Sequence, residues 1–281
     1  MKQGKPAKKY FQAGRLHGII RLLEARHGMA IDDLAAECGG DQRTIHRDLV
    51  AVEEAGYTLT SGGEGIIIPP DREIRAIVFD LDGTLYVSSE FAASIQEGAA
   101  VYLGGVLGVG VEEARQALAE ARNRLTKERG VAQTLSTTCG LLGGNIPDMH
   151  AFFQTWLSPE SYLSRDNRVI ALMECLRQRF ELVLYTNNNL LLTARITALL
   201  GIEGCFSRVF TIDDTWRAKP DGDRLEQILK AIGLPPDEVL FVGDRYEVDL
   251  HLPEQKGCPV FLSRSINQLL RLKQLLGINV E

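Results

Sequence analysis

Apolar residues in the first seventy positions recur at the three-and-four spacing that is typical of amphipathic helices. Three such stretches lie at residues 16–23, 31–38 and 45–52. Each stretch puts its apolar residues on one face, so the pattern predicts three short helices that share a core. Asp41 stands just before the third stretch, where its carboxylate can accept hydrogen bonds from the first free N–H groups of a helix.

The periodicity changes after Gly56. Residues 57–60 and 66–68 favour strands, and the glycine-rich segment 61–65 lies between them, which predicts a β-hairpin. Pro69 and Pro70 then end the pattern. We therefore expect a first domain at residues 1–70 and a second domain at residues 71–281.

Five short apolar runs follow in the second domain. They occupy residues 75–80, 182–186, 208–212, 239–244 and 259–263, and helical patterns separate the later ones. Strands that alternate with helices indicate an open parallel sheet with helices on both faces. The sequence predicts an α/β fold with a Rossmann-like parallel sheet.

About a hundred residues separate the first two runs, more than a crossover connection needs. Two stretches within them, at 111–125 and 147–157, have helical patterns, so we predict a helical cap domain inserted at about residues 87–165. The glycine-rich stretch 104–110 lacks the lysine and the preceding strand of a phosphate-binding loop, so we interpret it as a turn or a helix end.

Polar residues gather where the predicted strands end. In open parallel sheets, ligands bind outside the carboxyl ends of the strands, so these residues are the candidates for chemistry. They are Asp80 and Asp82 after the first run, Thr186 and Asn187 after the second, and Asp244 and Asp249 after the fourth.

Composition and charge narrow the class of protein. Apolar residues make up 45% of the 281 and charged residues 24%, which excludes a disordered or fibrous chain. The formal net charge of -6 argues against a protein that coats nucleic acid along its whole surface. Residues 1–26 are nonetheless basic, and this arm either touches nucleic acid or is a solvated tail.

Cysteine usage and hydropathy bear on the compartment. The five cysteines are scattered without a CxxC pair, which is typical of free thiols in a reducing compartment rather than of disulfides or a zinc site. No apolar run approaches the ~20 residues that span a bilayer, and the first ten residues lack the apolar stretch of a signal peptide. We expect a cytoplasmic protein without a membrane partner.

Four separated motifs identify a family. They are D-x-D-G-T at Asp80, a threonine after an apolar strand at Thr186, Lys219 followed by proline, and G-D-x-x-x-x-D at Asp244. In this order, the set resembles the phosphatases of the haloacid dehalogenase (HAD) superfamily over residues 75–263. The resemblance implies a phosphatase acting on a small phosphomonoester, with a nucleotide as one option.

The resemblance also implies a role for each motif residue. Asp80 would be the nucleophile that forms an aspartyl phosphate, and Asp82 would act as general acid and base. The dehalogenases of the superfamily lack the second aspartate, so Asp82 favours phosphatase chemistry. Thr186 and Lys219 would bind the transferred phosphoryl oxygens, with a backbone N–H of Asn187 added.

A magnesium ion completes the implied site. Asp80 and Asp244 would bind Mg²⁺ through side chains and Asp82 through its backbone carbonyl, which suits an ion that prefers oxygen ligands. Asp249 would orient Lys219 or a metal-bound water. The stretches FDLDGTLY, YTNNN and VGDRYEVD look most like the pyrimidine 5'-nucleotidase branch with a helical cap.

Two features of the second domain stay open between a structural and a functional role. Arg245 follows Asp244 and could serve either role. Thr134, Ser136, Thr137 and Thr138 form a polar run, which we interpret as an exposed helix face rather than as a lining of the site.

The first domain resembles the DeoR-type winged helix-turn-helix of bacterial repressors, most closely at RTIHRDL. In that arrangement the third helix enters the DNA major groove, so the resemblance predicts a homodimer on duplex DNA. The alternative is a dimerising or vestigial domain, because Asp41 stands where the family usually has serine. The expected DNA contacts are Gln42, Arg43, Thr44 and Arg47.

Two functions therefore remain in view. The first is a Mg²⁺-dependent phosphatase fused to a DNA-binding domain. The second is a transcriptional regulator whose phosphatase-like domain senses a phosphorylated metabolite. The complete motif set favours turnover, since a pure sensor would not need Asp82.

Overall fold

The computed structural model describes residues 8–25, 29–54, 59–62, 65–67, 73–129 and 133–278. The elements at the N-terminal end are α1 (Lys8–Ala25), α2 (Ile31–Cys38), α3 (Gln42–Glu54), β1 (Thr60–Gly62) and β2 (Gly65–Ile67).

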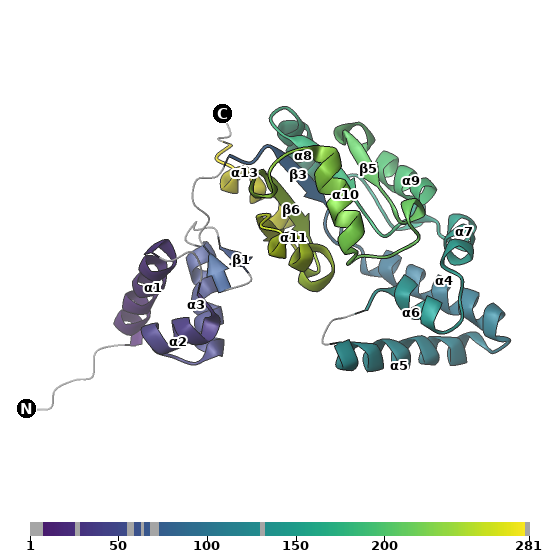
Figure 1. The fold of residues 1–281 in the computed structure, drawn as a ribbon, viewed down its shortest axis with the longest axis horizontal. Coiled ribbons are helices and arrows are strands. Elements are labelled where there is room, and N and C mark those ends of the chain that lie inside the picture. Colours follow the sequence, from purple (N-terminus) through teal and green to yellow (C-terminus); the bar gives the residue numbers. More distant parts are fainter. Residues whose placement is uncertain are drawn as a thin grey trace, which may run out of the picture.

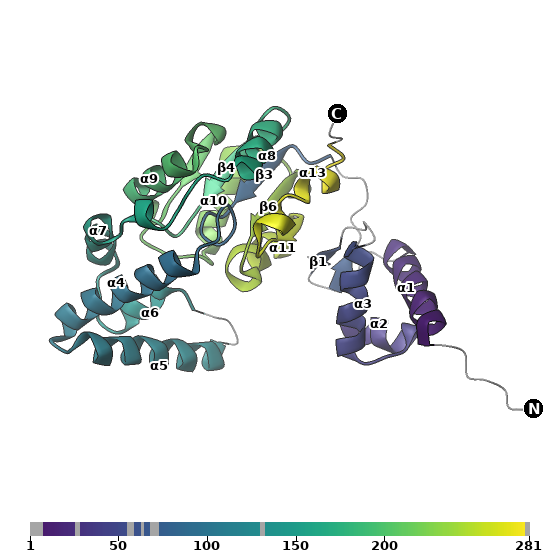
Figure 2. The same ribbon diagram turned by 180° about the vertical axis from the view of Figure 1, so that it is seen from behind.

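Helices α1–α3 share a core of their own. Ile19 of α1, Leu34 of α2 and Ile45 of α3 are completely buried in it. Arg15 of α1 also forms an ion pair with Asp48 of α3, whose side chain is fully buried. The three helices predicted from the apolar periodicity are confirmed, and they stand apart from the rest of the molecule in both views (Figures 1 and 2).

The predicted hairpin corresponds to an antiparallel pair of strands. Thr60 pairs with Ile67 and Gly62 with Gly65. The first strand thus begins at Thr60, the last residue of the predicted strand, whereas residues 57, 58 and 68 lie outside the described part of the chain.

The larger part of the chain is built on a parallel sheet. Its five strands run in the order β5-β4-β3-β6-β7, and every neighbouring pair is parallel. The α/β fold expected from the alternating runs is therefore confirmed. The strands are β3 (Ala76–Phe79), β4 (Glu181–Tyr185), β5 (Arg208–Phe210), β6 (Val239–Gly243) and β7 (Val260–Leu262).

Helices cover both faces of the sheet. Ile77 and Phe79 of β3 point to one face, where α8, α9, α12 and α13 pack, while Ala76 and Val78 point to the other face and α10. Because residues on both faces are buried, β3 and β6 read as continuous apolar runs. The covering helices are α8 (Asn167–Arg177), α9 (Leu190–Leu200), α10 (Gly222–Ile232), α11 (His251–Gln255), α12 (Ile266–Leu269) and α13 (Leu272–Leu275).

Among the described residues, four α-helices lie between β3 and α8, in the region where we expected a cap, and we call them the helical insert. They are α4 (Ser89–Leu107), α5 (Val111–Arg129), α6 (Leu135–Leu141) and α7 (Ile146–Trp156).

The insert lies beyond the edge of the sheet at which β3 ends (Figures 1 and 2). Helix α4 ends at Leu107 and is capped by Gly108, whose φ of 68° is left-handed, so the glycine-rich stretch is a helix end as predicted. The side chain of Asn189, at the start of α9, donates a 3.1 Å hydrogen bond to the main-chain oxygen of His150 and joins α7 to the core.

Candidate active site

The carboxyl ends of three neighbouring strands bring the polar motifs together. Asp80 follows β3, Thr186 follows β4 and Asp244 follows β6, with β3 hydrogen-bonded between the other two. Because the three strands are parallel, residues that lie 58 (186 to 244) to 164 (80 to 244) positions apart in the sequence meet at one edge.

A buried lysine lies between two aspartates. The ammonium of Lys219 is 2.6 Å from a carboxylate oxygen of Asp80 and 2.6 Å from one of Asp249, and all three side chains are buried. Burial opposes the charge of Lys219, but the two carboxylates raise its pKa above the usual value, so it stays an ammonium. Burial in turn raises the pKa of Asp80, and the Lys219 charge works against that rise.

Strand β4 and the residues after it fix the position of Lys219. Its ammonium also donates to the main-chain oxygen of Tyr185 at 3.1 Å, and its main-chain N–H donates to the side chain of Asn187 at 2.8 Å. The side-chain oxygen of Thr186 accepts from the N–H of Asn188 at 3.1 Å. Asn187 thus contributes its side chain to the loop of Lys219, a contact that the motif pattern did not predict.

Asp82 is held by two side chains that sequence reasoning missed. The hydroxyl of Tyr86 donates to one of its carboxylate oxygens, and the amide of Asn188 donates to the other at 2.7 Å. Burial raises the pKa of Asp82, while both hydrogen bonds favour the ionised form and work against that rise. The available signal was position, because Tyr86 closes the stretch FDLDGTLY and Asn188 lies within YTNNN.

Asp244 lies against the turn that follows Asp80. A Cβ atom on Gly83 would come within 2.5 Å of an oxygen of Asp244, and Gly83 has a φ of 85°. Both the close contact and the positive φ therefore require glycine at this position. The other oxygen of Asp244 is buried and, within the described residues, has no hydrogen-bond partner. Burial raises the pKa of Asp244 to about 6.

The carboxylates fit a divalent metal ion. Asp80, Asp244 and Asp249 each offer an oxygen, and these three atoms lie within 4.8 Å of one another. Both oxygens of Asp249 already accept hydrogen bonds, at 2.6 Å from Lys219 and 3.1 Å from the N–H of Arg245. Both oxygens of Asp80 accept hydrogen bonds as well, from Lys219 and from Thr84. The oxygen of Asp244 that accepts no hydrogen bond, 3.6 Å from Nε of Arg245, therefore makes Asp244 the best suited of the three to bind a metal ion.

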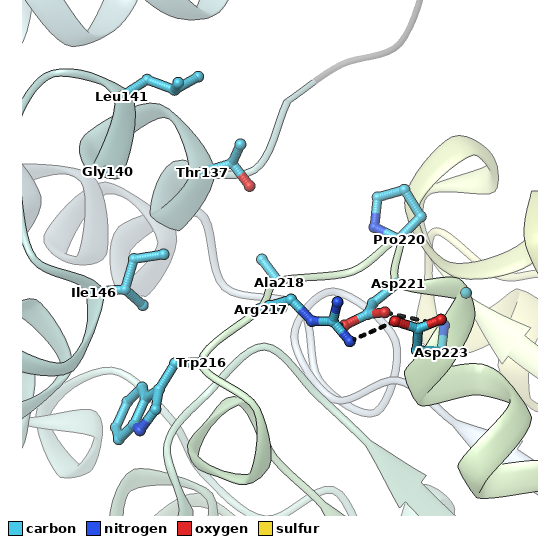
Figure 3. A pocket seen from close by; sticks show the side chains of 11 residues that line it. Thr137, Gly140, Leu141, Ile146, Trp216, Arg217, Ala218, Pro220, Asp221 and Asp223 are labelled. Carbon is cyan, nitrogen blue, oxygen red and sulfur yellow. Dashed lines mark hydrogen bonds and ion pairs between the residues drawn. The ribbon is translucent and has the colours of Figure 1, made fainter.

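A groove lies beside Lys219, between the core and the helical insert (Figure 3). It has a volume of about 610 Å³. Ala218 and Pro220, which flank Lys219, form part of its wall, and Thr137 and Ile146 of the insert form another part. Arg217 points into this region but pairs with Asp221 at 2.8 Å and with Asp223 at 3.0 Å, so its charge is already neutralised.

The polar run at the start of α6 is not an exposed helix face. Thr134, Ser136 and Thr138 are almost fully buried, and only Thr137 reaches the groove. The hydroxyl of Ser136 lies 3.2 Å from Nε2 of His150, which is also buried. Our interpretation of this run as a solvated face is wrong, because α6 packs between other helices of the insert.

The residues proposed to contact DNA lie elsewhere, on α3. Gln42, Arg43 and Arg47 are exposed and Thr44 is half-buried. The carboxylate of Asp41 accepts from the N–H of Thr44 at 2.7 Å, so the predicted helix cap is present. Gln42 donates to Asp32 of α2 at 2.6 Å.

Comparison with known proteins indicates the chemistry. A family model described as haloacid dehalogenase-like hydrolase matches residues 74–251. The phosphoglycolate phosphatase of Photorhabdus laumondii is 30% identical over 202 residues, which are 67% of this chain and 79% of that protein. The glyceraldehyde 3-phosphate phosphatase of Methanocaldococcus jannaschii is 26% identical over 196 residues, 66% of this chain and 82% of that protein.

Solved structures include a similar one. The match to the crystal structure of a HAD phosphatase from Thermococcus onnurineus covers 73% of this chain and 98% of that protein, at 20% identity and a TM-score of 0.49. Within the described residues, no helix is long and apolar enough to cross a membrane.

Proposed function

The chain belongs to the haloacid dehalogenase-like hydrolase family, and we propose that it hydrolyses a small phosphate monoester through a phosphoryl group carried on Asp80. It is a phosphoric monoester hydrolase, and the similar proteins act on phosphoglycolate and on glyceraldehyde 3-phosphate. The observation that carries the proposal is the buried carboxylate of Asp80, 2.6 Å from the ammonium of the buried Lys219, with the half-buried Asp82 two residues further along the chain.

Asp80 acts as the nucleophile in this proposal. One of its oxygens contacts Lys219 at 2.6 Å and the other accepts from the hydroxyl of Thr84 at 3.2 Å, so the carboxylate is held in one orientation. It attacks phosphorus, the ester oxygen leaves, and an aspartyl phosphate remains until water displaces it.

Asp82 transfers the protons. It gives a proton to the leaving oxygen in the first step and takes one from the attacking water in the second. The raised pKa of Asp82 supports the first task, because the carboxyl group then keeps its proton to a higher pH than an ordinary aspartate does. Tyr86 and Asn188 orient the carboxyl group between the two steps.

Lys219 and Thr186 bind the transferred phosphoryl group, joined by a backbone N–H of Asn187. The lysine is charged and buried, so its field acts on the phosphoryl oxygens with little screening by water. Asp249 keeps the ammonium in place.

Mg²⁺ is the ion proposed for this site, because it prefers carboxylate and carbonyl oxygens. Asp80 and Asp244 would hold it through their side chains, and Asp82 through its backbone carbonyl. When bound, the ion offsets the repulsion between the anionic ester and the aspartates.

The test of this function is phosphate release from a panel of phosphomonoesters, with Mg²⁺ present. Pyrimidine nucleoside 5'-monophosphates belong in the panel, because the stretches FDLDGTLY, YTNNN and VGDRYEVD support the nucleotidase branch. Rapid acid quenching should trap a phosphorylated protein. Absence of turnover on every ester would overturn the proposal.

A second function belongs to the N-terminal elements, residues 1–70, which we propose form a winged helix-turn-helix that binds duplex DNA as a homodimer. The supporting observation is that α3 buries Ile45, Leu49 and Val52 while it exposes Arg43 and Arg47. An exposed polar face on the helix after a tight turn is what insertion into a major groove requires. If DNA binding occurs without turnover, the chain is instead a regulator that senses a phosphorylated metabolite.

A further inference from the structure

The groove beside Lys219 has no role in the chemistry proposed so far. Its volume of about 610 Å³ lies within the range of small-molecule sites. Its walls come from two parts of the chain (Figure 3). The helical insert contributes Leu141 and Ile146, and the segment that leads into Lys219 contributes Trp216 and Ala218. A ligand in this groove would therefore contact the core and the insert at once.

Hydrogen bonds at both ends tie the segment 212–219 to the active site. The main-chain N–H of Ile212 donates to the main-chain oxygen of Asn188 at 3.1 Å. At the other end, the main-chain N–H of Lys219 donates to the side chain of Asn187 at 2.8 Å. Asn188 also donates through its amide to Asp82 at 2.7 Å. The groove thus lies next to the site, where the part of a substrate beyond its phosphate can extend.

Trp216 is an exposed aromatic residue in an uncommon backbone conformation. Its relative exposure is 36%, and its ring contacts that of His150 on α7, at 6.1 Å between the ring centroids. Its φ of 54° lies in the left-handed region, which bulky residues rarely adopt. Such strain is concentrated at ligand sites, and an aromatic ligand packed on the indole would remove apolar surface from water.

The charges along the groove disfavour an anion. Among the described residues that line it, the one cation is Arg217, which pairs with Asp221 at 2.8 Å and with Asp223 at 3.0 Å (Figure 3). One arginine and two aspartates leave the lining with a net negative charge. A carboxylate such as that of phosphoglycolate would therefore be repelled here.

We infer that this groove binds the leaving group of the substrate and selects one that is uncharged and aromatic, with its ring against Trp216. The inference rests on the proposed function, because it assumes that the ester phosphate binds at Asp80 and Lys219. Leu141 and Ile146 then cover the ring from the insert. The substrate class is a small phosphomonoester with an uncharged aromatic group beyond the ester oxygen.

The first experiment compares phosphate esters of primary alcohols, whose leaving oxygens are chemically alike. Phenylethyl phosphate carries a ring, hydroxyethyl phosphate a neutral polar end, phosphoglycolate an anion and phosphocholine a cation. We expect kcat/KM for phenylethyl phosphate to exceed each of the others by about tenfold or more, because the ring is buried from water. Equal values for the four esters, or a preference for one of the others, would overturn the inference.

Variants in both walls assign that preference. Trp216→Ala should reduce the ratio of kcat/KM between phenylethyl and hydroxyethyl phosphate by about tenfold, mainly through KM. Trp216→Phe keeps a ring and should retain most of the ratio, which a merely structural role would not explain. Leu141→Ser changes an exposed residue of the other wall and should reduce the ratio by about threefold. Leu107→Ser is its matched control, because Leu107 is exposed on α4 outside the groove lining, and it should leave the ratio unchanged.

A binding measurement tests the groove without turnover. The chain has two tryptophans, so Trp156→Phe leaves Trp216 as its one indole. Phenylpropylphosphonate has the shape of phenylethyl phosphate but no ester bond to break. It should change the fluorescence of this variant saturably, at a concentration about tenfold lower than propylphosphonate requires.

The outcomes separate the two proposals. A ratio in Trp216→Ala equal to that of the natural chain overturns the groove as the leaving-group site and leaves the phosphatase intact. If Trp216→Ala does not fold, Leu141→Ser becomes the deciding variant in the same way. If no ester is hydrolysed at all, the proposed function fails, and the titration decides the groove alone. A saturable response then supports an aromatic ligand at Trp216, and no response overturns it.

Discussion

At the scale of single residues, the site is a set of buried charges that compensate one another. Lys219 lies between Asp80 and Asp249. Without its positive charge, burial of either ionised carboxylate would cost much more free energy. Replacing a charged member of such a set leaves the others uncompensated. Replacing a hydrogen-bonding neighbour changes only the orientation and the pKa of one group. The two kinds of substitution therefore give different predictions.

The change Asp80→Asn should abolish turnover while the fold survives, because the amide has nearly the shape of the carboxylate but cannot attack phosphorus. Steady-state phosphate release and trapping of the phosphorylated protein measure the loss. The exposed Asp148 supplies the control variant Asp148→Asn, which should behave as the natural chain does. Activity of Asp80→Asn within about tenfold of the natural chain would contradict the assignment.

The change Tyr86→Phe tests how Asp82 is positioned. The lost hydrogen bond favoured the carboxylate, so the pKa of Asp82 should rise and its limb of the pH profile should move to higher pH. The kcat/KM for alkyl phosphates, which need protonation of the leaving oxygen, should fall about tenfold more than the kcat/KM for aryl phosphates. Tyr162→Phe is the control, as Tyr162 is exposed and lies outside this network. An unchanged pH profile of turnover in Tyr86→Phe would mean that Tyr86 contributes packing alone.

At the scale of elements, the packing of the helical insert and the pairing of the strands place side chains in surroundings that no local sequence pattern predicts. Helix α7 buries His150, and its Nδ1 has no hydrogen-bond partner among the described residues. Strands β3 and β6 bring Asp80 and Asp244 side by side although 164 positions, 244 minus 80, separate them. Both features have consequences for stability that can be measured.

Burial lowers the pKa of His150 to about 4, from an ordinary value of 6.5. The unfolded chain therefore binds a proton between these values while the folded chain does not, so stability is full above pH 6.5 and falls as the pH drops toward 4. The full effect is on the order of 3 kcal/mol. Urea unfolding at several pH values measures it.

His150→Gln should flatten this pH dependence, because glutamine does not titrate. His46→Gln provides the matched control, since His46 is exposed on α3, and its curve should follow that of the natural chain. An unchanged slope in His150→Gln would remove His150 as the cause.

Binding of Mg²⁺ between β3 and β6 should stabilise the folded chain. At a concentration one hundred times its Kd, a ligand that binds only the folded state adds about 2.7 kcal/mol, so the unfolding temperature should rise. Excess chelator should remove both this shift and the phosphatase activity. Asp244→Asn should show no shift, whereas Asp237→Asn, an exposed site just before the same strand, should keep it. A full shift in Asp244→Asn would rule out this metal site.

At the scale of the whole molecule, the described residues form three clusters of buried apolar residues that share no member. One lies among α1–α3 and the others lie on the two faces of the sheet. A fusion of this kind suits a protein in which one part binds DNA and the other binds a phosphorylated metabolite. Coupling between them requires that the metabolite bind the free and the DNA-bound states with unequal affinity.

We expect the full chain to select a specific duplex as a dimer, because one recognition helix covers too few base pairs for genomic specificity. Arg43→Ala should cost about 1–3 kcal/mol of binding free energy if Arg43 contacts a base. Arg21→Ala removes the same charge from the exposed side of α1 and is the control. Fragment selection at physiological salt and sedimentation with the selected duplex measure these outcomes. If no sequence is enriched, the N-terminal part is an interaction module.

The amino-acid sequence alone determined the class of fold and the identity of the motifs. Buried parallel strands are largely apolar, so the central strands β3, β4 and β6 were visible as short runs, and each of these runs ended in the polar residues that the fold brings to one edge. The helices of the N-terminal part were visible for a similar reason, because amphipathic spacing is a local property. The exact ends of β1 and β2 could not be predicted, since glycine-rich strands show little alternation of apolar and polar residues.

Only the tertiary structure decided how these pieces meet. The strand order, the place of Lys219 between Asp80 and Asp249, and the burial of the polar run in α6 all depend on packing between distant segments. Asn188 looks like an ordinary polar residue in the sequence. Its amide donates to Asp82, 106 positions away, because β4 pairs with β3, and such long-range contacts leave no trace in local periodicity.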